Sequence, residues 1–255
     1  MFAFRPTLPV SGEDRQWVES GFDRLGRALG HQRLLQARVI LPDAEHFPDP
    51  YDKSEAAAEK MFRRICDYMQ VDHGQIDLEF FPDETSELRK LMPYWSDGNG
   101  KSCAGLYFHP DDESRRMVVA MRASNMEDPL TVVATLAHEL GHVILLGGGR
   151  IDHNAKDMEP LTDLLTVYLG FGIFTANCSG RFRQWHKDGK QGWSMQRLGY
   201  LPEEVYGYAL ARFAHARQER NPKWTRHLST NLRSYFKKSA AWLEHDERIR
   251  KQPIG

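Results

Sequence analysis

The sequence has few cysteines and nothing typical of an exported protein. Only three of its 255 residues are cysteine, and Cys66, Cys103 and Cys178 lie far apart without a CxxC pair. This pattern argues against a disulfide framework and favours a reducing compartment. The start of the sequence has no basic segment followed by an apolar one, so it gives no sign of a secretory signal. We therefore expect a cytoplasmic protein.

An excess of charge of one sign is also lacking. The 34 basic and 35 acidic residues leave a net charge of -1 with histidine neutral. We therefore expect no nucleic acid and no anionic membrane as a partner, and we interpret the basic residues of the C-terminal third as solvated helix faces. The longest apolar stretch, about 130–146, is interrupted by His138, Glu139 and His142, which predicts a buried helix and not a membrane span.

What the sequence does contain is enough apolar material for a packed core. Hydrophobic residues make up 41% and charged residues 27%, the proportions of a globular protein, and no internal repeat is present. We divide the chain into an N-terminal helical region at 1–75, a catalytic core at 76–178 and a C-terminal helical region at 179–255. We expect the three regions to pack into one compact unit.

The spacing of apolar residues predicts an α+β protein with a small mixed sheet. We expect helices at about 11–29, 54–70, 129–146, 157–174, 202–220 and 223–244, with a loop from 181 to 199. Asp128 and Pro129 suit the start of the third helix, the glycines after 146 suit its end, and Asp157 can cap the fourth. Strands are expected at 76–81, 104–109 and 117–122, the last two forming a hairpin.

The helix at 129–146 carries the motif HELGH at 138–142. His138 and His142 are four residues apart, so their imidazoles lie one turn apart on one helix face and can reach the same zinc ion. Glu139 adjoins that face, where it can take a proton from a zinc-bound water whose pKa the metal lowers to about 7. These three polar side chains in an apolar helix need partners, which favours a Zn²⁺ site.

A third ligand is expected just downstream. Glu159 and Asp163 are four residues apart at the start of the next helix and share a face. Glu159 would bind the metal, and Asp163 could accept a hydrogen bond from the far ring nitrogen of His138, which would fix its tautomer. Asp152 and His153, in the loop between the two helices, are rival ligands.

HELGH followed by Glu159 and Asp163 resembles the gluzincin metallopeptidases, the thermolysin-like group, over about residues 117–174, or 76–174 if the strands are included. The resemblance implies a zincin-like core with His138, His142 and Glu159 as ligands, Glu139 as general base and Asp163 behind the ligands. The short glycine-rich linker before Glu159 is more similar to minimal zincins. A glycine, Gly148, lies six residues after His142 where metzincins have a third histidine, which argues against that group. Aspzincins use an aspartate ligand, so Asp163 stays an alternative.

The resemblance also implies a strand edge along the cleft and a donor for the oxyanion. By position the edge would be 104–109, to which a substrate backbone could add as another strand. Tyrosine and histidine supply such donors, and the candidates after the core are Tyr200, Tyr206, Tyr208, His186 and His215.

Three functions fit these residues. We expect a selective intracellular metallopeptidase that acts on a peptide or protein, with Glu139 activating water. The alternatives are a non-enzymatic regulatory or interaction module that retains a zinc site, and a zinc hydrolase of a non-peptide amide. The loop around Trp185, Gly189 and Trp193 pairs bulky residues with glycines, as a lid does.

Overall fold

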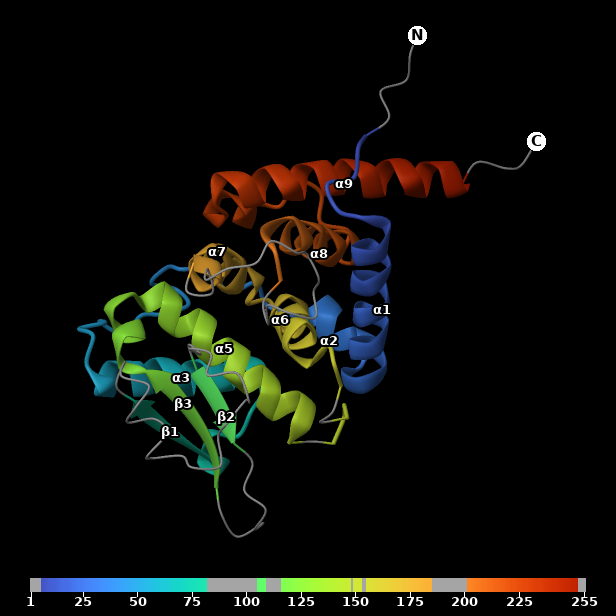
Figure 1. Cartoon of the computed structure of the whole chain (residues 1–255). Helices are drawn as coiled ribbons and strands as arrows, with labels where there is room; N and C mark the ends of the chain where they lie inside the picture. Colours follow the sequence, from blue (N-terminus) through green and yellow to red (C-terminus); the bar gives the residue numbers. More distant parts are fainter. Residues whose placement is uncertain are drawn as a thin grey trace.

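Helices make up most of the residues that the structure describes, and a small sheet lies at one end of the protein (Figure 1). The structure is a computed structural model that describes residues 6–81, 105–108, 116–147, 149–152, 155–184 and 201–251, with only the backbone at 105–108, 180–184 and 248–251. In chain order the described elements are α1 (Gly12–Leu29), α2 (His31–Gln36), α3 (Glu55–Met69), η1 (His73–Gln75), β1 (Ile76–Phe81), β2 (Gly105–Phe108), β3 (Met117–Arg122), η2 (Ala123–Glu127), α5 (Pro129–Leu146), α6 (Met158–Tyr168), α7 (Gly172–Gln184), α8 (Glu203–Ala216), η4 (Lys223–His227) and α9 (Thr230–Lys251).

Three helices begin where their local sequence predicts. The Ser11 side chain accepts a hydrogen bond from the Asp14 backbone N–H, and the Ser54 side chain accepts one from Ala57. Asp128 accepts from the Leu130 N–H, and Pro129 occupies the first turn, where its missing N–H costs nothing. The predicted starts of α1, α3 and α5 are therefore confirmed.

The sheet is mixed, as predicted, with three strands in the order β1-β3-β2. β1 pairs with β3 in parallel, from Ile76 opposite Met117 to Phe81 opposite Arg122, and β2 pairs with β3 antiparallel, which confirms the predicted hairpin. Helix α5 contacts β2, β3, α3, α6 and α7, so it lies between the sheet and the helices that follow it (Figure 1). The class is α+β and mostly helical.

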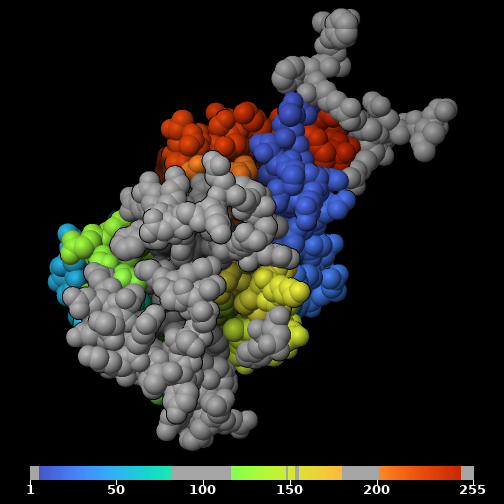
Figure 2. Space-filling view, in the orientation of Figure 1, coloured from blue at the N-terminus to red at the C-terminus, as the bar shows by residue number. Residues whose placement is uncertain are grey.

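One hydrophobic core includes residues from all three predicted regions. Val18 of α1, Leu140 of α5 and Phe213 of α8 all belong to it. By length and composition α5 could span a membrane, but 78% of that window is buried inside the protein, as in a core helix. In the space-filling view the surface of α1 adjoins the yellow surface of the α6 region (Figure 2).

The single helix predicted at 157–174 is wrong, because the structure has two. Helix α6 ends at Tyr168 and α7 begins at Gly172. Between them Gly170 has a φ of +91°, and a Cβ at this position would lie 2.0 Å from the Arg38 carbonyl oxygen. The Gly170 carbonyl accepts a hydrogen bond from the Ile40 N–H at 3.0 Å. The close approach of a distant segment thus sets the corner.

The predicted ends of the later elements also need correction. Helix α7 continues to Gln184, so residues 181–184 are helical and not part of a loop. Helix α8 ends at Ala216, short of the predicted 220. The last predicted helix is a 3₁₀ turn, η4, followed by α9, which runs to Lys251 instead of 244. A short helix that the sequence did not indicate, α2, follows α1 directly.

Candidate metal centre

His138 and His142 lie on the buried face of α5, with 4% and 7% of their surfaces exposed. Their Nε2 atoms are 3.2 Å apart and their ring planes are at 79° to one another. The i and i+4 spacing on a helix brings the rings together as predicted. Two buried imidazole nitrogens thus converge on one point.

Glu159, in the first turn of α6, completes this group. Its Oε2 lies 3.0 Å from His138 Nε2 and 3.4 Å from His142 Nε2. The ligand atoms of the three residues all lie within 4.8 Å of one another, so the group could hold a metal ion. Burial alone would raise the pKa of Glu159, but hydrogen bonds to both imidazoles lower it far below its ordinary value. Glu159 is therefore a carboxylate, the form that ligates a metal.

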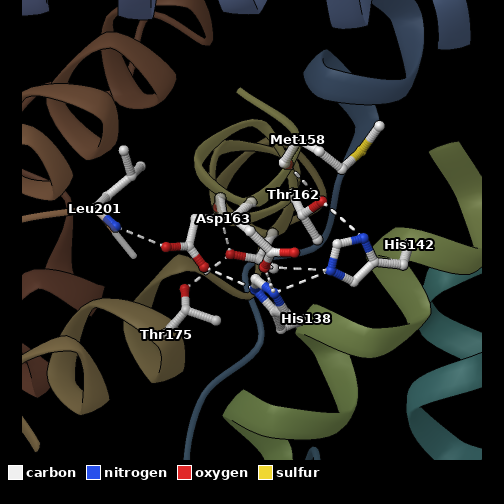
Figure 3. Close-up of polar contacts among 9 residues, drawn as sticks. His138, His142, Met158, Thr162, Asp163, Thr175 and Leu201 are labelled. Atoms are coloured by element: carbon white, nitrogen blue, oxygen red, sulfur yellow. Dashed lines mark hydrogen bonds and ion pairs between the residues drawn. The ribbon is translucent and has the colours of Figure 1, made fainter. Parts of the chain in front are cut away.

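Asp163, one turn after Glu159, contacts the other side of His138. Its Oδ1 lies 2.8 Å from His138 Nδ1, and its Oδ2 accepts a hydrogen bond from the Leu201 backbone N–H at 2.8 Å (Figure 3). Burial lowers the pKa of His138, but the carboxylates of Asp163 and Glu159 outweigh it and raise that pKa well above its ordinary value. This is the contact that the sequence predicts for an Asp163 that fixes the tautomer of His138.

Two threonines of α6, Thr162 and Thr166, lie near these residues, but only Thr162 contacts one of the histidines. Thr162 Oγ1 lies 3.4 Å from His142 Nδ1, and Thr166 Oγ1 donates to the Asp163 carbonyl at 2.7 Å and contacts Thr175 Oγ1 at 2.8 Å (Figure 3). Both threonines are fully buried. The sequence analysis missed both. The only sequence pattern that could have indicated them is their spacing, because they lie three and seven residues after Glu159 on the same helix.

Glu139 follows His138 directly and is 4% exposed. Burial, which disfavours the charged form, raises its pKa to about 7. A carboxyl group with a pKa near neutrality can both accept and return a proton at that pH, which suits a general base.

Helix α1 forms hydrogen bonds with the residue that precedes α6, Asp157. The Asp157 carboxylate accepts hydrogen bonds from Trp17 Nε1 at 3.0 Å and from Arg24 Nη1 at 2.5 Å, both on α1. Asp157 was predicted to cap α6, but its side chain makes no cap hydrogen bond because it is turned toward α1. It therefore ties the turn that carries Glu159 to the N-terminal helix.

Other predicted candidates lie elsewhere. Tyr208 donates to Glu19 at 2.7 Å, and His215 Nε2 lies 3.6 Å from Glu247, so both are directed at other partners. Tyr206 is buried in the core, and Asp152 is not among the described residues that form the ligand group. The described residues do not include several positions named in the sequence analysis: His153, His186, Tyr200, Gly148, Cys103 and the loop around Trp185, Gly189 and Trp193.

Two nitrogens and a carboxylate oxygen are the donor set of many catalytic zinc sites, which keep a fourth position open for water or substrate. The chemistry of the three residues therefore fits a divalent metal such as zinc. Compared with known proteins, the chain matches no family model, no curated protein and no solved structure.

Proposed function

We infer that this protein is a zinc-dependent hydrolase, and specifically a metallopeptidase of the gluzincin type. The observation that carries the proposal is the convergence of His138 Nε2, His142 Nε2 and Glu159 Oε2 within 4.8 Å, beside a buried Glu139. A purely structural zinc site has four protein ligands and needs no general base. The described residues supply three ligands next to a carboxyl group, an arrangement that supports a hydrolytic centre.

Each residue of the centre has a distinct part in this proposal. His138, His142 and Glu159 would hold the zinc, which supplies Lewis-acid polarisation of a substrate carbonyl and of water. Glu139 accepts a proton from the attacking water and passes it to the leaving amine. Asp163 accepts a hydrogen bond from His138 Nδ1, which fixes the ring so that Nε2 is the nitrogen that would bind the zinc.

The position of β2 supports a peptide as the substrate. In the order β1-β3-β2 this strand lies at an edge of the described sheet, and α5 contacts it. An extended peptide can add to a strand edge through main-chain hydrogen bonds, which places its backbone beside the helix of the HELGH motif. We extend the proposal to a selective enzyme, which should cleave casein slowly.

The test combines metal analysis with one substitution and a matched control. Protein purified without chelators should contain about one equivalent of zinc and should cleave members of a peptide library. Glu139→Gln should keep the zinc and lose the cleavage, because an amide cannot accept the proton. Glu127→Gln changes a carboxylate that is 72% exposed and pairs with Lys53, so it should behave like the wild type.

The outcomes separate the alternatives. A zinc-loaded wild type that binds library peptides without cleaving them would indicate the interaction module. Cleavage of non-peptide amides alone would indicate the other hydrolase. Loss of zinc in Glu139→Gln would make Glu139 a ligand, and one equivalent of iron in place of zinc would contradict the metal assignment, since two histidines and a carboxylate also bind iron.

A further inference from the structure

The two histidines of the centre differ in the partner behind each ring. His138 Nδ1 faces a carboxylate, that of Asp163, whereas His142 Nδ1 faces a hydroxyl, Thr162 Oγ1, at 3.4 Å. Thr162 is fully buried in α6, and Figure 3 shows its side chain between the Met158 carbonyl and the His142 ring. The hydroxyl can therefore help to select the tautomer of His142.

The hydrogen of this hydroxyl is already used. Thr162 Oγ1 donates to the Met158 carbonyl at 2.9 Å, the contact that threonine commonly makes with the carbonyl four residues before it in a helix. A threonine has one O–H to donate, so its oxygen faces His142 as an acceptor. The hydrogen of that contact then lies on His142 Nδ1, which leaves Nε2, the atom that faces Glu159 and His138, as the nitrogen available to a metal ion.

A glycine in the motif makes this approach possible. A Cβ at Gly141 would lie 2.7 Å from Thr162 Cγ2, closer than such atoms come, while its other neighbours would lie at 3.7 Å or more, which is ordinary contact. Only the methyl group of Thr162 therefore conflicts with a side chain at position 141. The absence of a Cβ at Gly141 lets α6 bring the Thr162 hydroxyl to the His142 ring.

We propose that Thr162 is a positioning residue for the metal centre: its hydroxyl accepts a hydrogen bond from His142 Nδ1 and directs the His142 Nε2 lone pair at the metal, and Gly141 is required for this contact. The inference deepens the proposed function and rests on its zinc site. It assigns a role to two residues that do not touch the metal.

The first test replaces the hydroxyl. Thr162→Val keeps the shape of the side chain and removes the acceptor, so zinc affinity measured by competition with a chromophoric chelator should fall by about 10–100-fold. Thr162→Ser keeps the hydroxyl and should bind zinc like the wild type. Thr166→Val is the matched control, because Thr166 is equally buried on the same helix but contacts Asp163 O and Thr175, and it should also bind like the wild type.

The second test asks whether a second substitution restores zinc binding to Gly141→Ala. Such a rescue would not occur if Gly141→Ala weakened binding only by disturbing the packing. Gly141→Ala should weaken zinc binding, because its methyl group pushes Thr162 away from His142. Adding Thr162→Ser removes the conflicting Cγ2 and keeps the hydroxyl, so the double variant Gly141→Ala/Thr162→Ser should regain the affinity. A double variant that binds zinc as weakly as Gly141→Ala alone would overturn the role given to Gly141.

A third measurement reads the tautomer itself. Nitrogen-15 NMR of the metal-free protein should show a proton on His142 Nδ1 in the wild type, in Thr162→Ser and in Thr166→Val, and partial loss of the proton at that nitrogen in Thr162→Val. A wild-type His142 with no proton on Nδ1, or a Thr162→Val variant with unchanged zinc affinity, would overturn the proposal. A wild type that binds no zinc would instead contradict the proposed function, and the NMR result would still decide the contact between Thr162 and His142.

Discussion

Two buried histidines in this protein have nearly the same local surroundings and differ in what the second ring nitrogen faces. His46 and His138 are each 4% exposed, and each has its Nδ1 against an aspartate oxygen, Asp43 at 2.7 Å and Asp163 at 2.8 Å. Nε2 of His138 converges with His142 and Glu159, whereas Nε2 of His46 has no hydrogen-bond partner among the described residues. A buried histidine paired with an aspartate therefore does not make a metal site by itself; convergence of ligand atoms is also needed.

The largest expected effect comes from replacing His138 and His46 with alanine, one at a time. His138→Ala removes one of three ligands, so bound zinc should fall from about one equivalent to none after dialysis. His46→Ala removes an equally buried imidazole and should keep the full equivalent, although it leaves a cavity and lowers the melting temperature. Metal analysis with a thermal melt of each variant measures both effects. Equal loss of zinc in the two variants would show that the Asp43–His46 pair belongs to the metal centre.

The second prediction separates the two carboxylates near His138. Glu159→Ala removes a ligand, so zinc affinity should collapse, whereas Asp163→Ala removes the partner of His138 Nδ1 and should cost about 10–100-fold. Chelator competition with both variants gives the order. The reverse order of severity would favour Asp163 as the third ligand, the arrangement of aspzincins.

The smallest expected effect concerns Asp43 and His46, the pair that does not converge with other ligand atoms. The hydrogen bond from His46 lowers the pKa of Asp43, so this carboxylate stabilises the fold above its ordinary pKa of about 3.9, and the contribution is lost as the pH falls through the lowered value. Asp43→Asn should cost about 1 kcal/mol or less at pH 7, because Asp43 is a third exposed. Urea unfolding should show a smaller gap between the two proteins at pH 3. A gap that widens toward acid would contradict this sign.

The sequence was informative where local chemistry sets the structure. Asp128 and Pro129 fixed the start of α5, and the four-residue spacings of His138 with His142 and of Glu159 with Asp163 indicated which side chains share a face. These features depend on neighbours within one or two turns. The residues that the structure brings together at the centre are therefore the predicted ones, while their roles in catalysis stay predictions.

The features that the sequence did not reveal depend on distant parts of the chain. The corner at Gly170 follows from the Arg38 carbonyl, more than a hundred residues earlier, and no proline marks it. Asp157 looked like a helix cap because Trp17 and Arg24 could not be placed beside it from sequence. The contact of Thr162 with His142 requires the packing of α6 on α5, and the partner of Asp163 at Leu201 is a backbone N–H, which every residue except proline offers.

The hydrogen bond between Asp163 and the Leu201 backbone also sets an order of events during protein synthesis. Leu201 follows Asp163 by 38 positions, so the ribosome makes the three ligands and Glu139 before the segment that occupies the second oxygen of Asp163. A nascent chain that ends before Leu201 holds His138, His142 and Glu159 but leaves the second oxygen of the buried Asp163 side chain without this donor, and a buried polar atom that lacks a hydrogen bond is costly. The arrangement behind His138 is therefore complete only after Leu201, just before α8, has been made and packed, which links the candidate metal centre to the folding of the C-terminal helices.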